Sequence, residues 1–140
     1  MDMELTDVTT GETFKISDFA GKPVLVESFA VWCPTCTEQQ KQTKKLESQV
    51  GSAIIHVSLD TDPNEDEARV REHIETYGFD WYYAVSPIEL TNSLREEFGN
   101  TIISAPLVPM ILVCPDQSTR FLRSGIKSAD DLLTEVEKGC

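Results

Sequence analysis

The sequence predicts an α/β fold in which helices cover both faces of a mixed sheet, giving three layers. Short apolar runs typical of buried strands alternate along the chain with longer stretches whose apolar residues recur at helical spacing. Near its end the chain instead has two β-prone runs joined by a turn and then one more helix, so the sheet is expected to be mixed. With 140 residues the chain is long enough to bury a core, and we expect one domain spanning residues 1–140.

The predicted strands are short runs rich in β-branched and aromatic residues. Residues 5–16 place a Thr-Gly turn between two such pieces, which indicates a small N-terminal hairpin. Further strands are expected at residues 23–30, 53–60, 81–85, 110–114 and 119–123. The turn Pro115-Asp-Gln-Ser would join the last two strands into a second hairpin.

The predicted helices begin at capping residues and end at glycines. The first covers about residues 34–50. The others are expected after the pair Asp62-Pro63, after a capping box from Ser86 to Glu89, and after a second capping box from Ser128 to Asp131. Their expected C-terminal glycines are Gly78, Gly99 and Gly139.

The charge balance of the chain disfavours several classes of partner. Twelve basic residues against 24 acidic residues give a net charge of −12, which would repel nucleic acids and favours a soluble, self-repelling monomer. No apolar run approaches the roughly 20 residues of a membrane-spanning helix. The N-terminus lacks the features of a signal peptide, so we expect a cytoplasmic protein if the chain is complete and an extracytoplasmic one if a leader or anchor was removed.

The stretch Ala30-Val-Trp-Cys-Pro-Thr-Cys-Thr37 carries the chemistry. Pro34 suits the first position of a helix, which places Cys33 at its N-cap, where free N–H groups and the helix dipole stabilise a thiolate. Helix geometry puts the Cα of Cys36 about 5 Å from that of Cys33, within the range for a disulfide. An exposed Cys33 thiolate could attack a substrate disulfide, and Cys36, facing inward, could then resolve the mixed disulfide.

Two other uses of the cysteine pair fit the sequence less well. A structural zinc site needs four ligands, and outside the pair the chain offers only isolated Cys114, Cys140, His56 and His73. A purely structural link between residues three apart constrains little chain entropy. We expect Cys114 to be an inert buried thiol and Cys140 to be a mobile spectator.

The W-C-x-x-C motif at a strand-to-helix junction resembles the thioredoxin superfamily. The N-terminal hairpin and the long stretch between Asp60 and Pro109 are more similar to its TlpA/ResA-like branch, which is related to the AhpC/TSA proteins. The resemblance covers about residues 5–138. It implies a thioredoxin-like α/β/α sandwich in which residues 62–98 supply an inserted strand and helix, with a redox-active Cys33–Cys36 disulfide and no other cofactor or metal.

The resemblance extends to further site residues. Glu27 occupies the position of the buried acid beneath the disulfide, and burial on the face of Leu25 and Phe29 would raise its pKa and suit it to carry the proton of Cys36. Val108-Pro109 resembles the family's cis-proline segment, which offers backbone groups to an extended substrate; Pro106 is a rival for this position.

Two aromatic positions complete the predicted site. Trp32 would form an apolar substrate platform with Pro34. His56 falls where thioredoxins often have a lysine near the acid, although a histidine in an apolar strand is more often a core residue.

We therefore expect a protein-disulfide reductase that exchanges disulfides with protein substrates and is recharged by an unidentified thiol reductase or other electron donor. The Pro-Thr pair between the cysteines differs from the Gly-Pro of thioredoxin, which leaves the direction of electron flow open. One alternative is a thiol module that binds copper or another metal. A second is a peroxiredoxin-like peroxidase, although Val26 and Ala30 stand where such enzymes have a proline and a hydroxyl residue.

Overall fold

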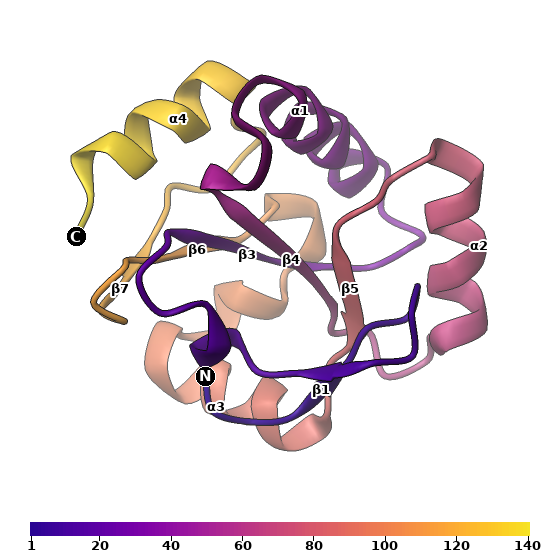
Figure 1. Ribbon diagram of the computed structural model, residues 1–140. Helices are drawn as coiled ribbons and strands as arrows, with labels where there is room; N and C mark the ends of the chain where they lie inside the picture. Colours follow the sequence, from indigo (N-terminus) through magenta and orange to yellow (C-terminus); the bar gives the residue numbers. More distant parts are fainter.

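The computed structural model describes residues 1–140, and its elements follow the predicted order (Figure 1). The strands are β1 (Leu5–Thr6), β2 (Thr13–Phe14), β3 (Val24–Phe29), β4 (Ile55–Asp60), β5 (Tyr82–Val85), β6 (Met110–Val113) and β7 (Thr119–Phe121). The α-helices are α1 (Pro34–Val50), α2 (Glu67–Tyr77), α3 (Ile88–Phe98) and α4 (Ala129–Lys138). Among the short 3-10 turns, η4 (Ala105–Leu107) bears on the site.

The central sheet has five strands in the order β5-β4-β3-β6-β7, and β1 and β2 form a separate antiparallel hairpin. Strands β5, β4 and β3 run parallel, whereas β6 and β7 are antiparallel to their neighbours, which confirms the mixed sheet. All six residues of β3 are buried, as the centre of a covered sheet requires. The register aligns Glu27 with Ser58 on β4 and with Met110 on β6.

The sheet lies between two layers, as the three-layer prediction required. On one face, Val24 and Val26 pack with the α3 residues Leu90 and Leu94 and with the hairpin. On the other face, odd-numbered β3 residues pack against α1, α2 and α4, with Leu25 and Phe29 in two apolar clusters. Figure 1 shows α1, α2 and α4 together on this side and α3 on the opposite side. The dithiol helix α1 therefore lies directly over Glu27.

Two helix starts differ from the prediction. Helix α2 begins after Asp66, whose side chain accepts the N–H of Arg69, and not after Asp62. Asp62 instead caps a separate turn by accepting the N–H of Asn64. The capping box at Ser86 is also absent, because the Ser86 hydroxyl bonds to Thr91 and Pro87 is the N-cap of α3.

Other helix boundaries confirm the predicted caps. Ser128 accepts the N–H of Asp131 while Asp131 accepts the N–H of Ser128, which is the complete capping box. Gly78 ends α2 in the left-handed conformation, with φ at 67°, which glycine adopts without a Cβ clash.

The expectation of two free thiols at Cys114 and Cys140 was wrong. They form a disulfide with Cα atoms 6.2 Å apart, joining the residue after β6 to the residue that follows Gly139. The chain brings them together because α4 runs back along the sheet and β7 holds its end. Arg120 on β7 donates to the backbone oxygens of Gly139 and Glu135 and pairs with the Glu135 carboxylate at 2.6 Å.

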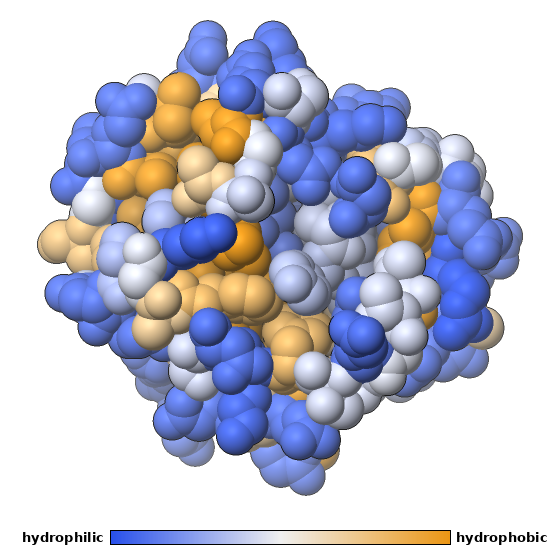
Figure 2. Space-filling view, viewed as in Figure 1, coloured by the Kyte–Doolittle hydropathy of each residue, from blue (hydrophilic) through white to orange (hydrophobic).

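On the face shown in Figure 2, hydrophilic side chains occupy most of the edge of the view, and apolar side chains gather in the areas between them. None of the helices combines the length and the apolar character that crossing a membrane requires.

Candidate dithiol site

Cys33 occupies the N-cap of α1, as the sequence predicted. Its backbone is extended, with φ −85° and ψ 110°, and Pro34 follows in the first turn of the helix. The N–H of Cys36 donates to Cys33 Sγ at 3.1 Å, so one of the free helix N–H groups points at the sulfur. The Thr35 hydroxyl lies 3.2 Å from the same sulfur. Free helix N–H groups and the positive end of the helix dipole thus face the sulfur.

The two thiols are free and both are fully buried, whereas an exposed Cys33 was expected. The turn η4 approaches the helix tip from the other side. Its Ala105 carbonyl accepts the Cys36 thiol at 3.3 Å, and its Pro106 carbonyl accepts the Thr35 hydroxyl at 3.2 Å. A substrate sulfur therefore reaches Cys33 only when the groups around the helix tip move aside.

Trp32 and Pro34 are the exposed residues beside the buried sulfurs, and Trp32 is 54% exposed. The Trp32 indole N–H donates to Asp62 at 2.7 Å, which holds the ring against the loop before α2. In the same loop, the Glu65 carboxylate accepts the N–H groups of Val31 and Trp32 at 2.7 and 3.3 Å. The loop between β4 and α2 thus fixes the turn that carries the dithiol.

The proline segment differs from what the resemblance implied. Every peptide bond is trans, including the one before Pro109. Val108 and Pro109 are buried, and the Pro109 carbonyl accepts the N–H of Ser28. The Ala105 carbonyl accepts the Cys36 thiol and the Pro106 carbonyl accepts the Thr35 hydroxyl, so the contacts to the dithiol turn come from the segment of the rival proline. Substrate binding by Val108 and Pro109 stays a prediction.

Glu27 is buried on β3 beneath α1. Its Oε1 accepts Gln40 Nε2 at 2.7 Å and the Ser58 hydroxyl at 3.1 Å, whereas Oε2 has no partner. Burial raises the pKa of Glu27 to about 7, against the opposing effect of these hydrogen bonds and of the Lys127 charge. Near neutral pH, Oε2 is therefore able to take up or release a proton.

The surroundings of Cys36 favour its protonated thiol form. Burial raises the pKa of its thiol well above the ordinary value, and the charge of nearby Glu27 raises it further. Its S–H donates to the Ala105 carbonyl, which also favours the protonated form. Cys36 is consequently held as a thiol, and it needs a base before it can act as a nucleophile.

A second layer of polar side chains surrounds Glu27. Gln40 Oε1 lies 2.7 Å from His73 Nε2 and accepts the Tyr83 hydroxyl at 2.8 Å. Trp81 Nε1 donates to the Ser58 hydroxyl at 2.9 Å. These contacts fix the two groups that bond to Glu27, so the carboxylate has a single defined position. Gln40 was not among the predicted site residues.

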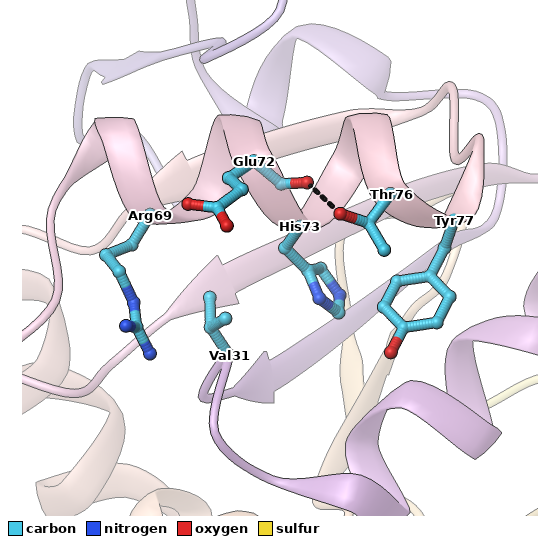
Figure 3. Close-up of a pocket in the computed structure, with 6 residues that line it drawn as sticks. All are labelled: Val31, Arg69, Glu72, His73, Thr76 and Tyr77. Atoms are coloured by element: carbon cyan, nitrogen blue, oxygen red, sulfur yellow. Dashed lines mark hydrogen bonds between the residues drawn. The ribbon is translucent and has the colours of Figure 1, made fainter.

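His73 connects this buried network to the surface (Figure 3). Its ring extends from α2 beside Val31, between Arg69 and Tyr77, and lines a shallow cavity of about 210 Å³. The dashed line in Figure 3 is the bond from the Thr76 hydroxyl to the Glu72 carbonyl, which belongs to α2 itself. Burial lowers the pKa of His73, so the neutral ring is favoured.

His56, considered as a proton partner of the acid, lies outside the network. Both of its ring nitrogens are buried without a hydrogen bond, and its ring packs edge-on against Trp81 with centroids 6.1 Å apart. Burial lowers its pKa to about 4. It behaves as the core histidine that was the alternative interpretation.

No three or more His, Cys, Asp or Glu side chains are placed together to hold an ion. The groups gathered beneath the tip of α1 are two thiols, a buried carboxyl group, and the hydrogen-bonded amide and hydroxyl groups that position it.

A protein-family model described as Redoxin matches residues 2–112. The chain belongs to the Redoxin family. Among curated proteins it is similar to "Thioredoxin-like protein YneN" of Bacillus subtilis, with 29% identity over 69 residues. That match spans 49% of this chain and 41% of the relative, so less than half of the relative's length is covered.

Solved structures share the fold across nearly the whole of this Redoxin-family chain. A thiol:disulfide interchange protein of the thioredoxin family from Chlorobium tepidum superposes with a TM-score of 0.80 at 18% identity, covering 98% of this chain and 92% of the other. A secreted Mycobacterium tuberculosis disulfide oxidoreductase homologous to E. coli DsbE gives a TM-score of 0.77 at 15% identity, with coverages of 98% and 96%. The protein thus has the fold of these solved structures, with Cys33 and Cys36 adjacent at the tip of α1.

Proposed function

We propose that this Redoxin-family protein reduces disulfides in protein substrates through Cys33 and Cys36. The observation that carries the proposal is the pairing of unlike thiols. Cys33 Sγ accepts a helix N–H, while Cys36 donates its proton to the Ala105 carbonyl above the network of a buried acid. The first arrangement favours a nucleophile and the second favours a resolving thiol that waits for a base.

The proposed reaction has two exchange steps. The Cys33 thiolate attacks one sulfur of the substrate disulfide, forms a mixed disulfide, and releases the other sulfur as a thiolate. The Glu27 carboxylate takes the proton of Cys36, whose sulfur attacks Cys33 Sγ and releases the second substrate thiolate. The substrate gains two electrons, and its two thiolates take up protons from solvent. Glu27 returns the proton of Cys36 to solvent, which also received the proton of Cys33 when its thiolate formed, and the protein is left with a Cys33–Cys36 disulfide that an external dithiol donor must reduce.

The surroundings of the dithiol suit a polypeptide substrate. Trp32 is exposed beside Cys33, and a cavity of about 210 Å³ lies between Trp32, Pro63, Ile103 and Ala105. Such a cavity accepts an apolar side chain next to the substrate cysteine. Ile103, two residues before η4, and Leu107, at the end of η4, are 38% and 42% exposed and extend this apolar surface.

The test is dithiol-dependent reduction of insulin. The wild-type protein should accelerate the reaction, and Cys33→Ser should remove the acceleration entirely. The matched control is the double variant Cys114→Ser/Cys140→Ser, which should stay active because it leaves the dithiol unchanged. Activity in Cys33→Ser would contradict the proposal, as would tight Cu(I) binding or rapid peroxide consumption by wild-type protein without disulfide exchange.

The reducing direction is tested separately by titrating the Cys33–Cys36 couple against glutathione. We expect a potential on the reducing side of roughly −180 mV, the value typical of protein disulfide isomerase. A markedly more positive potential would assign the protein an oxidising role instead.

A further inference from the structure

Lys127, in the loop before α4, is fully buried and plays no part in the reaction described above. Its Nζ donates to three backbone carbonyls: Val108 at 3.0 Å, Arg123 at 2.8 Å and Gly125 at 2.6 Å. No carboxylate bonds to it. A buried lysine is rare unless its charge is satisfied, and here carbonyl dipoles satisfy it.

The three contacts require the ammonium form. An ammonium has three N–H donors for three carbonyls, whereas a neutral amine has two donors and a lone pair that would face the third carbonyl oxygen. Burial and the Arg123 charge lower the pKa of Lys127 to about 8, while the charges of Glu27 and Asp131 act in the opposite direction. At neutral pH the group is therefore a buried cation.

Lys127 is also fastened to the dithiol helix through its backbone. Its N–H donates to Gln39 Oε1 at 2.7 Å, and its carbonyl accepts Gln39 Nε2 at 2.9 Å. Gln39 is fully buried and lies one helical turn after Cys36. The ammonium is thus held at a fixed distance from the resolving cysteine.

The Val108 carbonyl that Lys127 binds belongs to the segment over the dithiol. Val108 has φ 51° and ψ 57°, a left-handed conformation that is strained for a β-branched residue and persists only where its surroundings impose it. Its N–H donates to the Ala105 carbonyl, the same oxygen that accepts the Cys36 thiol. Leu107 in this segment also accepts the N–H of Gly125 at 2.8 Å.

We propose that Lys127 is a positioning residue for the dithiol: its ammonium holds the Val108 turn so that the Ala105 and Pro106 carbonyls meet Cys36 and Thr35, and its positive charge acts on the buried Glu27. This inference rests on the proposed function for its consequence, since both effects act on the resolving step. Lys127 touches neither the sulfurs nor the substrate. It acts through the carbonyls of residues 105–108 and through its field at Glu27.

The electrostatic part of the inference gives the sharpest test. Replacing the cation by a neutral side chain should raise the pKa of Glu27, because an adjacent positive charge favours the ionised carboxylate. The ionised fraction of Glu27 should then be smaller in the pH range just below neutrality, and the resolving step should slow by the same factor.

The experiment compares Lys127→Met with Lys127→Arg and with Lys45→Met, a control at an exposed lysine of α1. Two quantities are measured: the titration of the Glu27 carboxyl by ¹³C NMR, and the pH profile of insulin reduction. We expect both midpoints to move to higher pH in Lys127→Met, to stay near the wild-type value in Lys127→Arg, and to be unchanged in Lys45→Met. Unchanged midpoints in a folded Lys127→Met protein would overturn the inference.

A second measurement does not depend on the folding of the variant. If Lys127→Met does not fold, ¹⁵N NMR of the wild-type protein should show a slowly exchanging Lys127 ammonium whose shift changes when Cys33 and Cys36 are oxidised. A rapidly exchanging ammonium that is insensitive to oxidation would contradict it. The carboxyl titration does not depend on disulfide-exchange activity. If the wild-type protein fails to reduce insulin, the proposed function is refuted. If Lys127→Met still moves the titration midpoint of Glu27 in that case, the link between Lys127 and Glu27 stands.

Discussion

The chain carries two cysteine pairs that differ in almost every physical respect. Cys33 and Cys36 lie three residues apart, remain free thiols, and adjoin a buried acid and a network of amides and hydroxyls. Cys114 and Cys140 are 26 residues apart and form a disulfide that joins the end of β6 to the chain after α4. The pair that is close in sequence and has polar neighbours is suited to chemistry. The pair that is distant in sequence is suited to tethering the chain.

The physical reason lies in loop entropy and in the environment of the sulfurs. A link across 26 residues removes considerable freedom from the unfolded chain, whereas a link across three removes less. Conversely, only the first pair has a helix N–H pointing at one sulfur and a carboxyl group near the other. We propose that the first pair changes its redox state during function, whereas the second is a disulfide that tethers the chain.

The largest expected effect is the trapping of a substrate by the first cysteine pair but not by the second. Cys36→Ser should accumulate a mixed disulfide between Cys33 and a protein substrate, because the resolving thiol is absent. Non-reducing electrophoresis and mass spectrometry identify the linked cysteine. The matched Cys114→Ser variant should trap no substrate through Cys33, and a substrate linked to Cys140 in the Cys36→Ser protein would break the distinction between the pairs.

The next effect concerns stability. In a Cys33→Ser/Cys36→Ser background, reducing the Cys114–Cys140 disulfide should lower the free energy of unfolding by about 3 kcal/mol, from the entropy of a loop of this size. Urea unfolding with and without dithiothreitol measures the difference. The same protein carrying Cys114→Ser and Cys140→Ser should not respond to dithiothreitol. An equal response in both would show that the disulfide does not constrain the chain.

The third effect is a difference between the dithiol region and the disulfide region in the pH dependence of stability. The pKa of Glu27 is raised by burial from 4.5 to about 7 in the folded protein, so the folded state binds the proton more tightly. Its contribution to stability is complete below 4.5 and is lost as the pH rises through 7, by up to about 3 kcal/mol. Glu27→Gln should remove this part of the pH dependence of unfolding.

The control for Glu27 is Glu135, which lies in the disulfide region. Hydrogen bonding to Arg120 lowers the pKa of Glu135, so its contribution has the opposite sign and is lost as the pH falls. Glu135→Gln should therefore leave the neutral-pH slope unchanged. A wild-type slope in Glu27→Gln would mean that the carboxyl group is already hydrated in the folded state.

The smallest effect tests how the C-terminal region is held without its disulfide. Arg120 binds Gly139 and Glu135 through three contacts, and its ion pair with Glu135 is partly exposed. Arg120→Met should cost about 1 kcal/mol, the scale of such hydrogen bonds. The loss should be larger in Cys140→Ser protein than in wild type, because the disulfide and Arg120 fasten the same segment. Equal losses would show that the two act independently.

Sequence reasoning reached most of the fold because the signals were local. The strand β3 and the helix α1 follow from apolar runs, a proline and a cap within a few residues. The start of α2 was misplaced because Asp62-Pro63 and Asp66 both have capping character, and only the folded chain shows that Asp62 binds the Trp32 indole.

Features that depend on distant parts of the chain were beyond local patterns. The Cys114–Cys140 pairing requires α4 to return along the sheet, which no spacing rule encodes. Lys127 precedes a capping box and has the composition of a solvent-facing loop, yet residues 39 and 108 enclose it. Glu27 could be predicted because an acidic residue is unexpected within an apolar, buried strand. Lys127 could not, because a lysine beside a helix cap is common.

The two tryptophans give this protein a built-in optical readout. Trp32 is solvent-exposed beside Cys33, and its fluorescence should respond at long wavelength when the dithiol closes or a substrate attaches. Trp81 is buried and hydrogen-bonded through Ser58 to Glu27, so its short-wavelength emission should follow the protonation of that carboxyl group. A single emission spectrum can therefore separate electron transfer from proton transfer without any added label.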